Sequence, residues 1–328
     1  MNRREFIGGA AAAAGILATG RAFAGKADEI RGALLHFGTN MWQKGKHLRK
    51  LDFDEQVWRR LTDRMAELGY NTVFVDVGEA LNFPSHPELA VEGGWSPDRF
   101  RGEMRRLKAK GLEPIPKLNF SSTHNAWMGV YRRMTGTAKY YQAVQDLIRD
   151  TYEVFDRPRY FHIGMDEETL EDQLVHDYEF VVARHGELLW RDFNSLVKTV
   201  EDLGARAMSW GGMVRTQEEG FLKNVPRSVL LTVGYYRNWF DYSDRDFPKV
   251  NQHNLRAYEK LDRAGFEMVP CASNCVMDGA AAGLVKFCRA TIAPAHLKGF
   301  MTAPWEYSIP YGEPKCRKAI DELGATFC

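Results

Sequence analysis

The sequence has little cysteine, and all of it lies near the C-terminal end. Five cysteines occur in 328 residues, at positions 271, 275, 288, 316 and 328. Because the number is odd and only Cys271 and Cys275 are close neighbours, neither a disulfide framework nor a structural zinc site is indicated. Histidines and carboxylates also form no cluster at the spacings typical of metal ligands. We therefore expect no metal site and no cofactor.

An excess of charge of either sign is lacking as well. The chain has 44 Lys and Arg against 43 Asp and Glu, a formal net charge of +1. A nucleic-acid-binding protein normally shows a basic excess or patch, so we expect no nucleic-acid partner. The sequence also lacks a Gly-rich phosphate loop and a G-x-S-x-G nucleophile elbow, which argues against nucleotide chemistry and serine hydrolysis.

Only the N-terminus carries a long apolar run. The twin arginines Arg3 and Arg4 precede an Ala-rich run over residues 8–19, which is followed by Ala22-Phe23-Ala24, an A-x-A cleavage pattern. The run is too short for a membrane span. We predict a twin-arginine signal peptide over residues 1–24 and one exported domain over residues 25–328. The mature protein is expected in the periplasm or outside the cell, without a membrane span.

Beyond that leader, eight apolar segments alternate with amphipathic helical patterns. The predicted strands cover residues 33–42, 72–78, 113–120, 160–167, 206–212, 229–236, 267–273 and 299–305. The predicted helices cover residues 53–68, 97–110, 138–155, 183–203, 251–264, 280–292 and 314–323, with a short one near 217–223. Glycines 69, 111, 204 and 265 each follow a helix, where a left-handed C-cap requires glycine. Eight βα units in about 300 residues predict a single-domain (β/α)8 TIM barrel, with a doubly wound sheet as the alternative.

The active site of such a barrel lies at the C-terminal ends of its strands. Acids, amides and aromatic residues dominate those ends: Asn40, Trp42, Asp76, Glu79, Asn119, His124, Asp166, Glu167, Trp210, Tyr235, Tyr236, Trp239, Asn274, Asp278, Trp305 and Glu306. Carboxylates with aromatic rings suit a carbohydrate better than a phosphorylated substrate. Because Tyr235 and Tyr236 alternate along one strand, at most one faces the mouth of the barrel, and we expect Tyr235.

Asp166 and Glu167 are the strongest single feature. Side chains alternate along a strand, so both acids reach the mouth only if the chain turns at the strand end. Two nearby carboxylates raise the pKa of one of them, which gives a proton donor beside an ionised carboxylate. The alternative is structural: Asp166 would cap the following helix and Glu167 would be a solvated acid of its first turn.

Four segments resemble one enzyme family. Residues 162–167, with the sequence HIGMDE, resemble the H-x-G-G-D-E segment of family 20 glycoside hydrolases, the β-N-acetylhexosaminidases. Residues 116–124 resemble the P-E-x-D-x-P-G-H segment of their third strand. Residues 209–211 resemble the Trp-bearing strand that walls the sugar pocket, and residues 305–306 resemble a late Trp-x-Glu pair.

The resemblance implies a retaining mechanism in which the substrate assists. Asp166 would polarise the 2-acetamido group of the sugar, whose oxygen attacks the anomeric carbon, and Glu167 would be the general acid and base. The resemblance also implies a glycoside hydrolase with a carbohydrate substrate, which the N-terminal pattern predicts to be exported. The expected binding residues are His124, Asn119, Trp210, Tyr235, Trp305 and Glu306.

Two alternatives remain open at this point. Glu306 could be the nucleophile of an ordinary double displacement with Glu167 as the acid, for which a carboxyl separation of about 5–5.5 Å is typical. The barrel could also bind carbohydrate without catalysis. Met165 in place of the family's second Gly, and Asn119 in place of an Asp, favour that second alternative.

Overall fold

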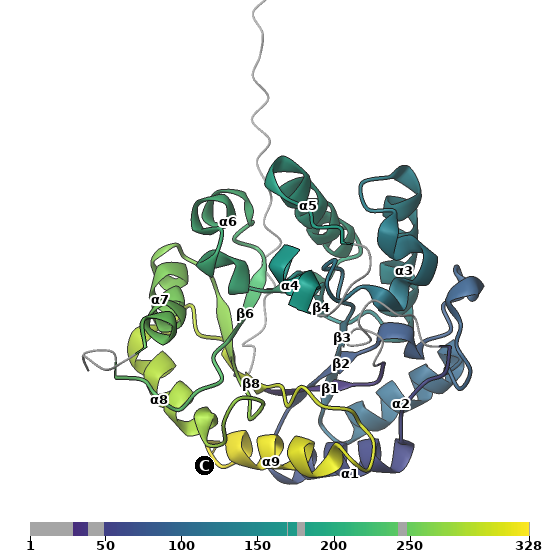
Figure 1. Ribbon diagram of the computed structural model, residues 1–328. Helices are drawn as coiled ribbons and strands as arrows, with labels where there is room; N and C mark the ends of the chain where they lie inside the picture. The colour runs from purple at the N-terminus through teal and green to yellow at the C-terminus, as the bar shows by residue number, and fades with distance from the viewer. Residues whose placement is uncertain (1–28, 39–48, 169, 176–180, 242–247, 328) are drawn as a thin grey trace, which may run out of the picture.

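The structure is a computed structural model that describes residues 29–38, 49–168, 170–175, 181–241 and 248–327. The predicted signal peptide and the strand-end residues Asn40 and Trp42 lie outside the described residues. Figure 1 shows the chain winding once around a central barrel, with the C-terminal helix beside the first one.

Eight parallel strands form a closed barrel in chain order, each paired with the next and the last with the first. They are β1 (Ile30–His36), β2 (Thr72–Asp76), β3 (Glu113–Lys117), β4 (Tyr160–His162), β5 (Arg206–Trp210), β6 (Leu230–Gly234), β7 (Met268–Ala272) and β8 (Gly299–Thr302). The predicted (β/α)8 barrel is therefore confirmed, and the doubly wound sheet is excluded.

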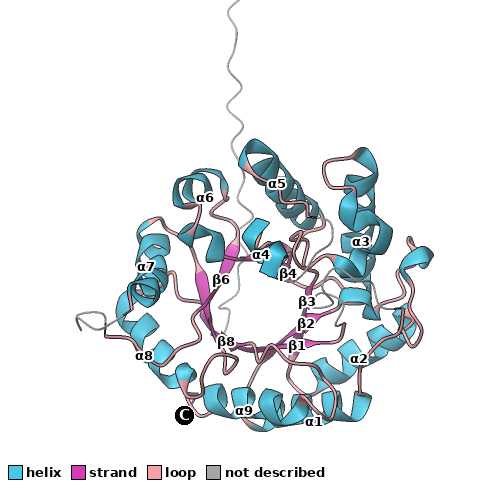
Figure 2. Ribbon diagram, viewed as in Figure 1, coloured by secondary structure: helices cyan, strands magenta, loops and turns pink. Residues whose placement is uncertain are grey.

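Helices surround the barrel, as Figure 2 shows. They are α1 (Glu55–Glu67), α2 (Pro97–Ala109), α3 (Ala138–Val154), α4 (Leu170–Val175), α5 (Gly186–Asp202), α6 (Glu218–Asn224), α7 (Lys249–Arg263), α8 (Ala280–Thr291) and α9 (Glu313–Gly324). Short 3-10 helices follow several strands, among them η4 (Ala126–Arg133) after β3. None of the helices in the described part of the chain has the length and apolar character needed to cross a lipid bilayer.

Both faces of the strands are buried, which explains their near-continuous apolar runs. Leu34 belongs to a cluster inside the barrel, whereas the next residue, Leu35, belongs to the larger cluster between the barrel and the helices. The helix-to-strand joints also follow the prediction, because glycines 69, 111, 204 and 265 have φ angles of 78°, 77°, 96° and 78°. A side chain at these positions would strain the left-handed backbone.

Candidate functional site

A polar layer closes one half of the barrel just below its C-terminal edge. His36, Asp76, Lys117 and His162 are register partners on β1 to β4, and all four are buried. Lys117 Nζ lies 2.6 Å from Asp76 Oδ2, and His36 Nδ1 lies 3.1 Å from the same oxygen. Burial alone would raise the pKa of Asp76, but Lys117 and His36 outweigh it and lower that pKa to about 2. The layer thus contains a buried ion pair between Lys117 and Asp76. The sequence alone did not indicate that Lys117 and His36 belong to the site.

The chain turns sharply where β4 ends. The strand stops at His162, five residues earlier than the predicted end at Glu167, because Gly164, Met165 and Glu167 have φ angles of 71°, 63° and 48°. A Cβ on Gly164 would lie 2.1 Å from Asn119 Oδ1, so only glycine fits there. The same Asn119 oxygen accepts a hydrogen bond from the Met165 amide at 3.2 Å. This turn is what directs two successive acids to one side.

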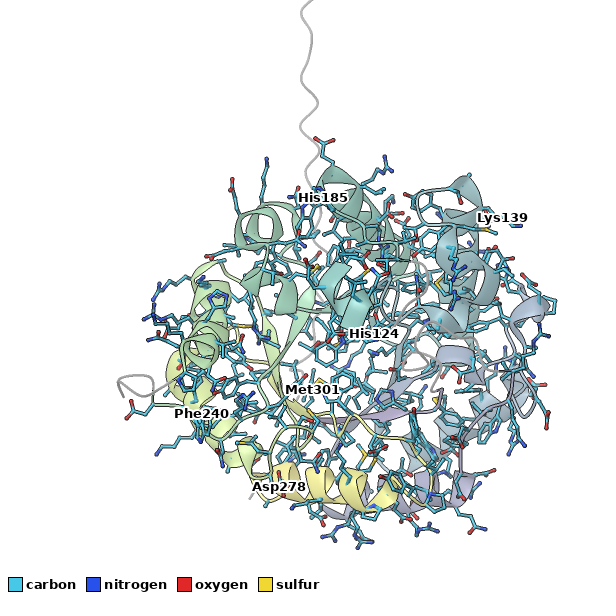
Figure 3. All side chains as sticks on the ribbon, in the orientation of Figure 1. His124, Lys139, His185, Phe240, Asp278 and Met301 are labelled. Carbon is cyan, nitrogen blue, oxygen red and sulfur yellow. The ribbon has the colours of Figure 1, made fainter. Side chains whose placement is uncertain are left out.

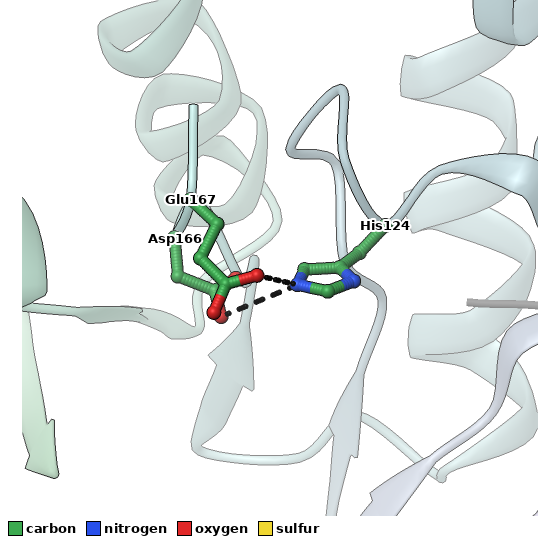
Figure 4. A group of neighbouring side chains, drawn as sticks. All are labelled: His124, Asp166 and Glu167. Atoms are coloured by element: carbon green, nitrogen blue, oxygen red, sulfur yellow. Dashed lines mark hydrogen bonds and ion pairs between the residues drawn. The ribbon is translucent and has the colours of Figure 1, made fainter. Parts of the chain in front are cut away.

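Asp166 and Glu167 contact two polar side chains from the loop after β3, Asn119 and His124. Figure 4 shows His124 with its ring directed at the two acids. His124 Nε2 lies 2.8 Å from Glu167 Oε2 and 3.9 Å from Asp166 Oδ2. Asn119 Nδ2 donates to Asp166 Oδ1 at 2.8 Å. The Glu167 side chain is 45% exposed and that of Asp166 only 20%, so the first faces solvent and the second lies deeper. Asp166 is therefore a member of this group and does not cap a helix, since α4 begins only at Leu170.

The pKa values of Asp166 and His124 are both raised, for different reasons. Burial raises the pKa of Asp166, and the neighbouring Glu167 carboxylate adds to that effect, while His124 and Lys117 oppose it. Burial alone would lower the pKa of His124, but Asp166 and Glu167 outweigh burial and raise it to about 9. At neutral pH the site therefore contains an imidazolium within hydrogen-bonding distance of one carboxyl group and near a second, deeper one. Such a group can store and transfer protons.

Aromatic side chains form a second group at the mouth. The rings of Trp210 and Trp305 lie 5.4 Å apart, and those of Tyr236 and Trp305 lie 6.3 Å apart. His36 lies 5.8 Å from the Trp305 ring, so this aromatic wall adjoins the polar layer. The indole Nε1 of Trp210 is buried without a hydrogen-bond partner among the described residues. An unpaired buried donor is costly, which makes it a point where a ligand oxygen would bind.

The expectation for Tyr235 was wrong, because the neighbouring Tyr236 faces the mouth. Tyr235 packs in the outer cluster, with its ring 5.3 Å from that of Phe240 and its hydroxyl donating to the Trp239 carbonyl at 2.6 Å. Figure 3 shows Phe240 in the outer ring of the molecule, whereas His124 lies over its inner part. Along β6, Leu231 and Val233 already belong to the outer cluster. Counting in twos from those residues would have assigned Tyr235 to the outside.

Glu306 belongs to neither group. Its Oε1 accepts the backbone N–H of Tyr307 at 3.0 Å, and its Oε2 lies 3.8 Å from Lys315 Nζ on α9. It follows Trp305, whose φ of 50° turns the chain just after β8. The structure thus brings together Asn119, His124, Asp166 and Glu167, and separately Trp210 with Trp305.

Sequence spacing indicates no metal-ligand cluster, but the fold brings three residues with ligand atoms together. His124, Asp166 and Glu167 each offer one ligand atom, and these atoms lie within 4.8 Å of one another. His124 and Glu167 are 43 positions apart in the chain, so no local spacing reveals the group. A divalent cation there would need the neutral imidazole and would replace the proton between His124 and Glu167.

Comparison with known proteins finds similar structures but no similar sequences. No family model matches the chain, and no curated protein matches its sequence. An N-acetyl-β-hexosaminidase of Streptomyces plicatus is 15% identical, with a TM-score of 0.58 over 90% of this chain and 63% of that one. A β-N-acetylhexosaminidase of Bacteroides fragilis is 11% identical, with a TM-score of 0.59 over 89% of this chain and 65% of that one.

An exo-β-N-acetylglucosaminidase of family 20 from Vibrio harveyi, solved with N-acetylglucosamine, is 14% identical, with a TM-score of 0.57 over 89% of this chain and 54% of that one. The chain therefore spans between about half and two thirds of the length of these three proteins. It shares the barrel fold of family 20 glycoside hydrolases.

Proposed function

We propose that this protein is a glycoside hydrolase that removes a β-linked 2-acetamido-2-deoxyhexose by a retaining, substrate-assisted mechanism. The observation that carries the proposal is the group of Asp166, Glu167 and His124, in which one acid is deep and the other is exposed and hydrogen-bonded to an imidazole. The fold agrees with it, since the similar structures include one that holds N-acetylglucosamine.

In the proposed reaction the two acids have different tasks. Glu167, the exposed acid, gives a proton to the glycosidic oxygen while the acetamido oxygen of the substrate attacks the anomeric carbon. Asp166 orients the acetamido group and stabilises the positive charge that develops on it; Asn119, which donates to Oδ1, leaves Oδ2 for that contact. Water then attacks the anomeric carbon and Glu167 takes back a proton.

In the proposed reaction His124 exchanges a proton with Glu167. Its Nε2 lies 2.8 Å from Glu167 Oε2, so a proton can pass between the two groups as the leaving oxygen demands it. The aromatic wall of Trp210, Trp305 and Tyr236 excludes water from the sugar on the other side. The indole N–H of Trp210 donates to a polar atom of the bound sugar.

The direct test is a panel of chromogenic glycosides. The purified protein should hydrolyse the 4-nitrophenyl β-glycoside of N-acetylglucosamine or N-acetylgalactosamine, and it should not hydrolyse the matching glycosides that have a 2-hydroxyl group. The acetamido oxygen is the nucleophile, so its removal leaves no attacking group. Equal rates on both kinds of glycoside would instead indicate double displacement. Binding of N-acetylglucosamine without turnover of any glycoside would indicate a carbohydrate-binding barrel.

The pH dependence of stability provides an independent measurement on His124. Burial acts against it, but Asp166 and Glu167 raise the pKa of folded His124 to about 9, above the ordinary value of 6.5. A raised folded pKa adds stability that is complete below pH 6.5 and is lost as the pH rises through about 9. The free energy of unfolding in urea should therefore fall across this interval more steeply in the wild type than in His124→Gln. Parallel slopes would contradict the ion pair.

We also propose that the twin-arginine pathway exports the protein, with cleavage after residue 24. The motif around Arg3 and Arg4, the apolar run and the A-x-A pattern support it. Replacing both arginines with lysine should leave the protein in the cytoplasm at its full length. Secretion of this variant at the wild-type level would refute the proposal, and an immunoblot of fractionated cells measures it.

A further inference from the structure

A fully buried ion pair lies directly behind the proposed catalytic acid. Glu168 follows Glu167 in the chain, and its side chain is 0% exposed. Its partner Arg184, just before α5, has a side chain that is 1% exposed. Burial alone would raise the pKa of Glu168, but the charge and hydrogen bonds of Arg184 outweigh it and lower that pKa, so the pair is ionised.

Both oxygens of Glu168 are fully engaged. Oε1 accepts from Ser122 Oγ at 2.5 Å, from the Arg184 backbone N–H at 3.0 Å and from Arg184 Nε at 2.8 Å. Oε2 accepts from the Ser122 backbone N–H at 2.7 Å and from Arg184 Nη2 at 2.9 Å. The carboxylate thereby ties the turn after β4 to the loop after β3 and to the segment before α5.

Arg184 also contacts the elements that surround Glu168. Its Nη2 donates to the Phe120 carbonyl at 2.6 Å and lies 3.6 Å from Met165 Sδ. Its Nη1 lies 3.5 Å from the Tyr140 hydroxyl on α3 and 3.7 Å from Asp192 Oδ2 on α5. The Arg184 guanidinium therefore contacts the loop after β3, the turn after β4 and the helices α3 and α5.

The main chain of Glu167 is held between these contacts. Thr123 Oγ1 donates to the Glu167 carbonyl at 2.5 Å, so the residue beside Ser122 fixes the peptide that joins Glu167 to Glu168. Glu167 itself has a φ of 48°, a strained conformation for a residue with a side chain. Such strain persists only where the surroundings determine it, and the next residue, Glu168, is fixed by its hydrogen bonds to Ser122 and Arg184.

We infer that Glu168 and Arg184 are positioning residues of the proposed reaction, which hold the Glu167 carboxyl group at the barrel mouth and against His124. The inference rests on the proposed function. Stability alone does not explain the pair, because a buried ion pair is commonly no more stabilising than an apolar pair of similar volume. The charged pair instead fixes the position of the turn after β4, because its hydrogen bonds reach the backbone of Ser122 and Phe120 in the loop after β3.

The test replaces both members of the pair, so that neither Glu168 nor Arg184 remains as a lone buried charge, while Asp192 keeps its hydrogen bond from the Tyr141 hydroxyl. In the double variant Glu168→Met with Arg184→Met, we expect a melting temperature close to that of the wild type. The kcat for the chromogenic N-acetylhexosaminide should fall about tenfold or more, while KM changes less than about threefold, since misplaced acids slow the chemical step more than they weaken binding.

A second readout does not depend on turnover. The pKa of His124, followed by NMR of its imidazole, should be about 9 in the wild type and should move toward 6.5 in the double variant, because the Glu167 carboxyl group is no longer held beside it. If the wild type hydrolyses none of the glycosides, the proposed function fails, and the His124 titration still decides whether the pair positions Glu167.

The matched control is a pair at the opposite end of the barrel. Arg206, the first residue of β5, is hydrogen-bonded to Glu267 just before β7, and both lie at the N-terminal ends of the strands. Methionine at both positions should leave kcat and the His124 pKa unchanged. A folded Glu168→Met, Arg184→Met variant with wild-type kcat and wild-type His124 pKa would overturn the inference. If that variant does not fold, Glu168→Gln is measured in its place, with the same two outcomes deciding.

Discussion

Replacing Glu167 with Gln should lower kcat for an aryl N-acetyl-β-hexosaminide by about 10²–10⁴-fold, the usual contribution of general acid–base catalysis, with little change in KM. Glutamine keeps the shape of the side chain and a carbonyl oxygen that can accept from His124, which lies 2.8 Å from Glu167 Oε2 in the wild type. It has no proton to give to the leaving oxygen. Steady-state kinetics on the folded variant measure the loss.

Two comparisons make this prediction specific. A dinitrophenyl leaving group needs little protonation, so its glycoside should lose less rate in Glu167→Gln than the 4-nitrophenyl glycoside does. Glu306→Gln is the control, since Glu306 is bound to Tyr307 and Lys315 and not to His124. If Glu306→Gln were as damaging as Glu167→Gln, with trapping of a covalent glycosyl-enzyme, double displacement would replace the substrate-assisted mechanism.

Features governed by neighbouring residues could be predicted from the sequence. Alternation of apolar strands with amphipathic helices and the glycine after four of the helices predicted the closed barrel, which the structure confirms. The adjacent acids Asp166 and Glu167 were placed at the end of the fourth strand for the same reason. The required turn is there, produced by left-handed residues from Gly164 onward.

Features that depend on pairing across the barrel could not be predicted. The sequence does not indicate that Lys117 on β3 meets Asp76 on β2, because the register between strands appears only when the barrel closes. Arg184 lies within a predicted helix, so the sequence does not indicate that it pairs with Glu168 across the loops. Tyr235 was misassigned for a smaller reason, since alternation alone does not tell which of Tyr235 and Tyr236 faces the mouth.

Asn119 departs from the pattern given by the resemblance, and its contacts are compatible with the proposed mechanism. The resemblance places an Asp at this position, and a carboxylate there would repel Asp166 unless the two shared a proton. The amide of Asn119 instead donates to Asp166 Oδ1 at 2.8 Å, while its own oxygen accepts from the Met165 and Ser121 amides. The departure at Asn119 is therefore compatible with an ionised Asp166 and with the strained turn at Met165.

Asp166→Asn should lower kcat on 2-acetamido substrates by about 10²–10³-fold, a loss comparable to that of one preorganised group in an oxyanion hole. Asparagine at this position has no negative charge to stabilise the positive charge that develops on the acetamido group. Its amide must also turn its oxygen to Asn119, which places an NH2 group toward the imidazolium of His124, 3.9 Å from Asp166 Oδ2 in the wild type. The pKa of His124 should therefore fall as well.

The matched control is Asp278→Asn, in the loop between β7 and α8 at the same end of the barrel. Asp278 is 60% exposed and pairs with Lys318, so its loss should change neither kcat nor the His124 titration. If Asp166→Asn retains wild-type turnover while Glu167→Gln is inactive, the acetamido group is not the nucleophile, and the protein is a glycosidase with another attacking group. If both variants retain turnover, the catalytic group lies elsewhere in the barrel. Only a joint loss, with Asp278→Asn unaffected, is consistent with a deep acid that polarises the substrate and an exposed acid that protonates it.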